Sequence, residues 1–121
     1  MIKGSTGFPP GLAEKTKEGQ VLNAVSQWLS LKYIPHWRIN SGGLKDRHGR
    51  LVRFGAKGMA DFYAIGPNGI SIWIECKRPK GGKLTESQRE FLDCINRNGG
   101  VGIVVNSTES LEEQLKEAGI I

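Results

Sequence analysis

Two carboxylates and a lysine occupy strand-like positions between Gly58 and Gly82, where acidic side chains are uncommon. Asp61 begins one run of alternating apolar residues, and Glu75 and Lys77 lie near the end of the next run. Side chains alternate between the two faces of a strand, so Glu75 and Lys77 share a face. Carboxylate oxygens suit Mg²⁺ and Mn²⁺, and a nearby lysine suits phosphate chemistry. The function therefore depends on whether Asp61 lies beside this pair.

The turn between the two runs decides whether the acids meet. A three-residue loop, 67–69, places Asp61 opposite Glu75 with their Cβ atoms about 5 Å apart. A two-residue turn, 68–69, places Asp61 opposite Cys76 and separates the charges. Only the longer loop puts the apolar positions of both runs on one face, which is the pattern of a buried face. We therefore predict the three-residue loop.

Two adjacent carboxylates repel each other unless a proton, a basic side chain or a shared cation lies between them. In one interpretation Lys77 neutralises the pair, and the cluster is structural. In the other, Asp61 and Glu75 hold a divalent cation with the backbone carbonyl of Cys76, and Lys77 orients the water that attacks a phosphodiester. Glu18, on the first expected helix, is either a first-turn residue favoured by the helix dipole or a residue directed at the site.

The remaining pattern predicts the elements that position these residues. A capping box of Thr85 and Gln88 begins one helix, and glycines 99–100 end it. We expect Tyr63 and Trp73 to pack under the first helix. The order α-β-β-β-α-β-α predicts an α/β domain with a mixed sheet flanked by helices. Its expected elements are a helix at 17–33, a strand at 36–40, a basic glycine-rich loop with a small hairpin, strands at 60–66 and 70–78, the capped helix, a strand at 101–105 and a final helix from 107 to about 119.

The positive charge is concentrated in the middle of the chain. The net charge is +5 over 121 residues, but residues 36–83 contain ten basic and three acidic side chains. This distribution suggests one face for a polyanion, with nucleic acid the default candidate, and a merely solvated lysine-rich surface is the alternative that charge alone leaves open. The candidate phosphate contacts are Arg38, Lys45, Arg47, Arg50, Arg53, Lys57, Arg78, Lys80 and Lys83.

The length predicts one domain, with residues 1–11 as a flexible arm and residues 12–121 as the folded unit. No apolar run approaches a membrane span, and no signal peptide is apparent. The two cysteines have neither metal-ligand spacing nor a secreted context, so we expect them to be reduced. A cytoplasmic protein is expected, and a virus-encoded one is compatible with the sequence.

Several short motifs together resemble the PD-(D/E)xK nuclease superfamily and, more narrowly, its VRR-NUC (virus-type replication and repair nuclease) domain. They are Gly58-Met59-Ala60-Asp61, Glu75-Cys76-Lys77, Leu84-Thr85 with Gln88, and Trp37-Arg38-Ile39-Asn40-Ser41-Gly42. The similarity runs from about Glu18 to Val105, as in a stand-alone version of the domain. One departure is Ala60, where the superfamily name implies proline.

This resemblance implies a restriction-endonuclease-like core and a Mg²⁺- or Mn²⁺-dependent DNA endonuclease. It also implies a structure-selective homodimer similar to Holliday-junction resolvases. The alternative is a non-catalytic DNA-binding or assembly module with a structural ion-pair cluster, and RNA cleavage would use the same residues. The implied roles are metal ligands for Asp61, Glu75 and the Cys76 carbonyl, catalysis for Lys77, support for Gln88, and for Glu18 the acidic position of the first helix, acting directly or through water.

Overall fold

A mixed four-stranded sheet carries the residues with candidate chemistry. The computed structural model describes residues 17–39, 43–45, 47–53 and 57–121, so the predicted arm, residues 1–11, lies outside the described residues. Strand β5 pairs antiparallel with β4 and parallel with β6, and β1 pairs antiparallel with β4. This confirms the predicted α/β class and element order. The sheet order is β1 (His36–Arg38), β4 (Phe62–Ile65), β5 (Ser71–Cys76) and β6 (Val101–Val105), with helices α1 (Lys17–Leu31), α2 (Glu86–Arg97) and α3 (Thr108–Glu117).

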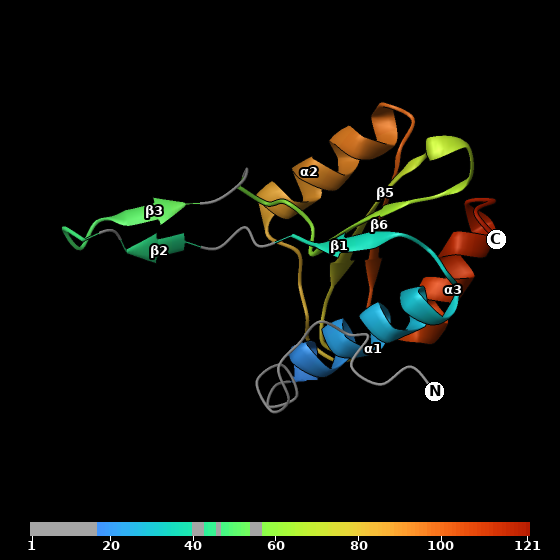
Figure 1. The fold of residues 1–121 in the computed structure, drawn as a ribbon, viewed down its shortest axis with the longest axis horizontal. Helices are drawn as coiled ribbons and strands as arrows, with labels where there is room; N and C mark the ends of the chain where they lie inside the picture. Colours follow the sequence, from blue (N-terminus) through green and yellow to red (C-terminus); the bar gives the residue numbers. More distant parts are fainter. Residues whose placement is uncertain (1–16, 40–42, 46, 54–56) are drawn as a thin grey trace.

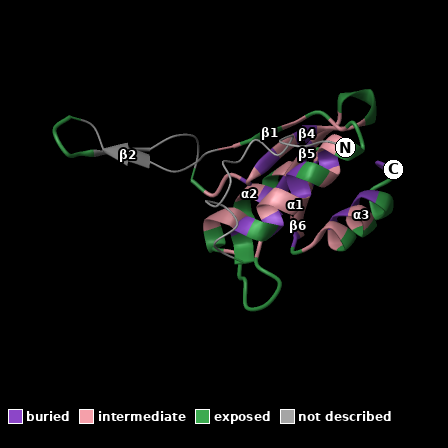
Figure 2. Cartoon of the chain, turned by 60° about the horizontal axis from the view of Figure 1, so that its bottom comes forward, coloured by how far each residue is buried: buried purple, intermediate pink, exposed green. Residues whose placement is uncertain are grey.

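The hydrophobic core lies between the sheet and the pair formed by α1 and α3, and α2 covers the opposite face (Figure 1). Helix α1 buries Val21, Val25 and Leu29, whose spacing of four residues places them on one side of a helix. The residues coloured as buried fall mainly in the strands of the sheet and along α1 and α3 (Figure 2). Within the described residues, no helix is long and apolar enough to cross a membrane.

The hairpin of β4 and β5 has the predicted register. Phe62 lies opposite Ile74, and the turn that joins the strands is the 3₁₀ segment η2 (Pro67–Gly69). One step further along the same pairing, Asp61 lies opposite Glu75. The three-residue loop is therefore confirmed, and the shorter turn is excluded.

Several details differ from the sequence-based expectation. Strands β4 and β5 are shorter than the predicted 60–66 and 70–78, so Asp61 precedes β4 and Lys77 follows β5. Helix α1 ends at Leu31 rather than Tyr33, because Tyr33 adopts a left-handed conformation with φ 57° and the Ile34 N–H donates to the Leu29 carbonyl. The expectation that Tyr63 and Trp73 pack under the first helix is wrong. The Trp73 ring meets Phe91 of α2 edge-on, with centroids 5.2 Å apart, and the Tyr63 ring lies against Trp73, because this side of the sheet faces α2.

The basic loop between β1 and β4 contains a two-stranded hairpin. Strands β2 (Gly43–Lys45) and β3 (Leu51–Arg53) pair antiparallel as a separate sheet. In Figure 1 this hairpin extends away from the four-stranded sheet. The small hairpin predicted here is confirmed.

Candidate active site

Asp61 and Glu75 meet where β4 begins and β5 ends. Glu75 is 3% exposed, and Asp61 immediately precedes β4. The Cys76 N–H donates to Asp61 Oδ2 at 2.7 Å, which ties this carboxylate to the neighbouring strand. Burial raises the pKa of the Cys76 thiol, with Asp61 and Glu75 adding to the effect. That thiol therefore stays protonated and buried in the core, and Cys76 contacts Asp61 through its backbone N–H.

Lys77 and Gln88 complete a connected polar cluster around Glu75. Lys77 Nζ lies 3.4 Å from Glu75 Oε2 and donates to Gln88 Oε1 at 3.0 Å. Gln88 Nε2 donates to Glu75 Oε2 at 3.2 Å. The same Gln88 Oε1 accepts the Thr85 N–H at 2.9 Å, and Thr85 Oγ1 accepts the Gln88 N–H. The predicted capping box is confirmed, and its glutamine also contacts both charged groups.

Arg38 has a contact that the sequence did not indicate. Its Nη1 donates to the Asp61 backbone carbonyl at 3.0 Å and lies 3.6 Å from Asp61 Oδ1. The sequence suggested only a phosphate contact for Arg38. Its place beside Asp61 follows from the pairing of β1 with β4, in which the Ile39 N–H donates to the Asp61 carbonyl.

The electrostatics of the cluster favour an added positive charge. Burial and, to a smaller extent, the negative charge of Asp61 raise the pKa of Glu75 from 4.5 to about 8, even though the opposing charge of Lys77 lowers it. Lys77 therefore does not fully compensate the two acids. A cation placed between the carboxylates would oppose the same repulsion.

The raised pKa of Glu75 should make the free energy of unfolding depend on pH. Because folding raises the pKa of Glu75, the folded chain holds a proton that the unfolded chain has released between pH values of about 4.5 and about 8. The stabilisation that this bound proton gives the folded state is complete below this range and is lost as the pH rises through about 8. In EDTA, we expect the free energy of unfolding to fall by on the order of 2–4 kcal/mol across the range.

Urea unfolding from about pH 5 to about pH 9 measures this change. Glu75→Gln is the matched variant, because glutamine resembles the protonated acid and cannot titrate. It should remove most of the decline and be more stable than the wild type at the alkaline end. An equal decline in both proteins would contradict the assignment to Glu75.

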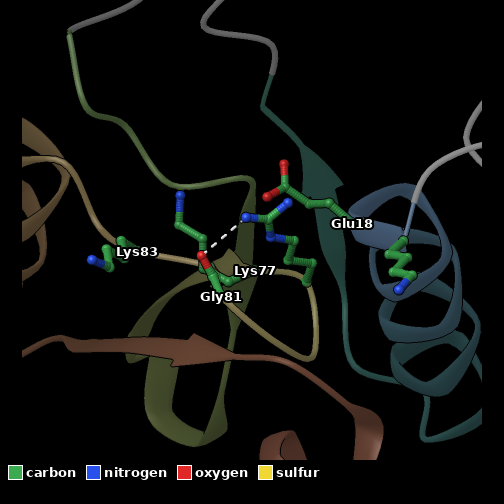
Figure 3. Close-up of a pocket in the computed structure, with 7 residues that line it drawn as sticks. Glu18, Lys77, Gly81 and Lys83 are labelled. Carbon is green, nitrogen blue, oxygen red and sulfur yellow. Dashed lines mark hydrogen bonds between the residues drawn. The ribbon is translucent and has the colours of Figure 1, made fainter.

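Glu18 lines the same cleft as Lys77 but does not join the carboxylate pair in a three-member cluster among the described residues. Both residues line a cleft of about 480 Å³ between the start of α1 and the loop after β5 (Figure 3). Among the described residues, no three side chains of His, Cys, Asp or Glu come together to hold a metal ion. The remaining lining residues are Lys17, Arg78, Gly81, Gly82 and Lys83.

The cleft is strongly basic, with four basic lining side chains and Glu18 as the acidic one. An Arg78 Nη2–H donates to the Gly81 carbonyl at 3.2 Å, and this bond holds the loop folded (Figure 3). Lys45 and Arg53 lie in β2 and β3, where only the backbone is described. The other predicted phosphate contacts are all exposed, namely Arg38, Arg47, Arg50, Lys57, Arg78, Lys80 and Lys83.

Gly58, three residues before Asp61, allows the chain to pack closely against the start of α2. Its φ is +82°, and a Cβ at this position would lie 2.4 Å from the Ser87 carbonyl oxygen and 2.9 Å from the Gln88 nitrogen. A side chain here would push the segment that carries Asp61 away from the start of α2. Steric overlap with α2 therefore explains why this position, close to Asp61 in the chain, is a glycine.

Gly58→Ala is expected to destabilise the fold by about 3 kcal/mol, because it combines backbone strain with overlap against the backbone of α2. Gly69→Ala is the matched control, since its φ is +79° and nothing lies within 4 Å of the added Cβ. That control should cost only about 1 kcal/mol, the strain alone. Chemical denaturation of both variants measures the difference. Equal losses would show that the contact with α2 is unimportant.

Comparison with known proteins tests the fold. No family model and no curated protein matches this chain by sequence. A solved structure described as a "VRR_NUC domain" superposes with a TM-score of 0.61, at 22% identity, over 84% of this chain and 96% of that chain.

The chain has the VRR_NUC fold.

The VRR_NUC fold explains why the described acids, Lys77 and Gln88 share one end of the sheet. The hairpin brings Asp61 to Glu75, and the crossover from β5 to β6 places the start of α2 over them. The fold resemblance inferred from the motifs is confirmed. Ala60 is 1% exposed, so a small apolar residue fits there without proline.

Proposed function

We propose that this protein is a divalent-metal-dependent DNA endonuclease that hydrolyses phosphodiester bonds. The observation that carries the proposal is the incompletely neutralised pair of buried Glu75 and half-buried Asp61 beside Lys77 and a basic cleft. Perturbed carboxylates in such a position mark candidate catalytic sites. The VRR_NUC fold supports a nuclease over other uses of the same cluster.

The donor set fits Mg²⁺ or Mn²⁺. Asp61, Glu75 and the Cys76 carbonyl would hold the ion, with Glu18 contributing through water, and such ions need only one or two carboxylates because they keep several waters. When bound, the ion polarises a phosphate and lowers the pKa of water. The raised pKa of Glu75 is the structural sign of this fit, since a bound cation would favour the ionised carboxylate.

Lys77 would act on the phosphate and the attacking water. Its ammonium group is fixed by Gln88 and Glu75, and its side chain is only 14% exposed. This preorganised charge can offset the negative charge that develops on the phosphoryl group and orient the water. Gln88 acts through Lys77 and Glu75, so it is a positioning residue.

The basic cleft and the exposed cations would contact the DNA backbone. Phosphate contacts of this kind position DNA without reading its sequence, and within the described residues we find no helix placed as a reader of base edges. Selection by DNA structure follows from this arrangement. We infer a homodimer similar to Holliday-junction resolvases, because a symmetric junction needs two coordinated cuts and each chain supplies one site.

A nuclease panel tests the proposal. Four-way junction, flap, splayed-arm, duplex and single-stranded DNA, each with an RNA counterpart where possible, should be incubated with and without Mn²⁺. Cleavage of branched DNA that depends on Mn²⁺ is expected. Intact substrates under all conditions would reject the enzyme.

The rival function is a non-catalytic DNA-binding or assembly module whose acids are neutralised by Lys77 and Arg38. Titration calorimetry with Mn²⁺ separates the two functions. A nuclease should show saturable binding that Glu75→Gln weakens, whereas the ion-pair module should show none.

A further inference from the structure

A row of aromatic rings crosses the sheet on the face that also carries the acids. Trp37 of β1 stacks on Tyr63 of β4 with ring centroids 5.8 Å apart and planes at 23°. Tyr63 lies 4.8 Å from Trp73 of β5, which in turn meets Phe91 of α2. The row is thus packed against a helix at one end and reaches the edge strand β1 at the other.

Trp37 is the open end of this row. It is 51% exposed although one side of its ring rests on Tyr63. Trp73 is held by a hydrogen bond from its Nε1–H to Ser71 Oγ at 2.7 Å. The rings beneath Trp37 are therefore fixed, and its orientation is set before anything binds, which lowers the entropic cost of stacking.

The position of Trp37 relates it directly to the candidate site. Trp37 pairs with Tyr63, and Asp61 lies two residues before Tyr63 on the same face. Diagonal neighbours of this kind lie about 7–8 Å apart. A DNA strand covers this distance in about two nucleotides where its bases stay stacked at about 3.4 Å each, and in fewer where they are unstacked. A strand whose phosphate reaches Asp61 and Glu75 would therefore bring a nearby base to Trp37.

We propose that Trp37 stacks on an unpaired nucleobase about two nucleotides from the phosphate to be cut. This proposal rests on the proposed DNA substrate and narrows it to single-stranded, flap or branch-point DNA. In a continuous duplex both faces of each base are covered by neighbouring bases. A free aromatic face can stack only on a base that has left the helix.

A nucleobase fits this surface better than a second copy of the chain. A stable protein interface needs about 800 Å² from each partner with an apolar centre. Among the described side chains, the exposed large hydrophobic residues are Leu31, Tyr33, Trp37 and Ile121. Of these only Trp37 belongs to the sheet. A single flat, exposed ring suits one base better than a broad apolar contact.

The test measures binding in EDTA, so that it does not depend on cleavage. A flap with 2-aminopurine two nucleotides from the branch point, a single strand and a fully paired duplex are titrated with the wild type and with variants at Trp37. Trp37→Ala should weaken binding to the single strand and the flap by about 10-fold and remove the quenching of 2-aminopurine. Duplex affinity should change less than about twofold. Trp37→Phe should retain most of the binding and the quenching.

Tyr33→Asn is the matched control, because Tyr33 is an exposed aromatic residue with φ 57° near the end of α1, and asparagine tolerates this conformation. It should bind every DNA as the wild type does. Unchanged flap and single-strand binding by Trp37→Ala would overturn the proposal. A loss of self-association in Trp37→Ala on size-exclusion chromatography, with DNA binding intact, would also overturn it and assign the ring to a second copy.

The binding test of Trp37 and the nuclease test can succeed or fail independently. If Trp37→Ala loses flap binding but the wild type cuts nothing with Mn²⁺, base stacking stands and the enzyme fails. If the wild type cuts flaps and Trp37→Ala binds and cuts them equally well, the enzyme stands and base stacking is overturned.

Discussion

Asp61→Asn is expected to lower Mn²⁺-dependent cleavage by about 10³-fold while the protein remains folded. Asparagine keeps an oxygen that can accept the Cys76 N–H, which now donates to Asp61 Oδ2 at 2.7 Å. The variant therefore removes the negative charge and preserves the bond between the strands. A loss of several kcal/mol of transition-state stabilisation is the reason for a factor of this size.

Initial rates on the best substrate of the nuclease panel, with saturating Mn²⁺, measure the loss. Asp93→Asn is a suitable control, because Asp93 is exposed on α2 and should leave the rate unchanged. Asp61→Asn should also make Glu75 easier to ionise, since Asp61 raises its pKa. Cleavage by Asp61→Asn at the wild-type rate would show that Asp61 does not hold a catalytic ion.

The hairpin that carries the acids could be predicted from sequence because its determinants are local. Alternation assigned the isoleucines of β5 to the core, and the turn length then fixed which residue opposes Glu75. A shift by one residue would have moved every side chain to the other face, so only one register was consistent with a buried core. The same locality made the capping box of α2 predictable.

The contacts between elements could not be predicted in the same way. Alternation shows which residues share a face of a strand, but not which helix covers that face. Alternation alone therefore places Trp73 under α1, whereas its ring meets Phe91 of α2. The contact of Gln88 with Glu75 likewise depends on how α2 packs over β5. The bond from Arg38 to Asp61 needed the pairing of β1 with β4, which joins residues far apart in the chain.

Glu18 shows the limit of a single-residue argument. The sequence leaves Glu18 either as a first-turn residue favoured by the helix dipole or as a residue directed at the site, and the structure places it, exposed, in the cleft with Lys77. A role through water agrees with this position. Direct contacts or close approach connect the other four site residues, Asp61, Glu75, Lys77 and Gln88. For Glu18, a measurement of Mn²⁺ binding is needed to show whether it contributes to the site.

Lys77→Met is expected to reduce turnover by about 10²–10³-fold while Mn²⁺ still binds. Methionine keeps much of the length of the side chain and removes its charge. Gln88 Oε1 would retain the Thr85 N–H as a donor, so the start of α2 should stay in place. Because Lys77 lowers the pKa of Glu75, its removal should raise that pKa further, and binding of Mn²⁺ should need a higher pH.

Calorimetry and cleavage rates measured on the same sample separate these effects. Lys116→Met serves as the control, since Lys116 pairs with Glu112 on the exposed side of α3 and should affect neither measurement. A structural ion pair predicts the opposite result for Lys77→Met, namely a loss of stability with no Mn²⁺ binding in either protein. Retained Mn²⁺ binding with lost turnover, both measured at a pH where each protein is saturated with the ion, would assign Lys77 to the chemical step, because a lysine that only neutralises Asp61 and Glu75 has no part in the reaction once the ion is bound.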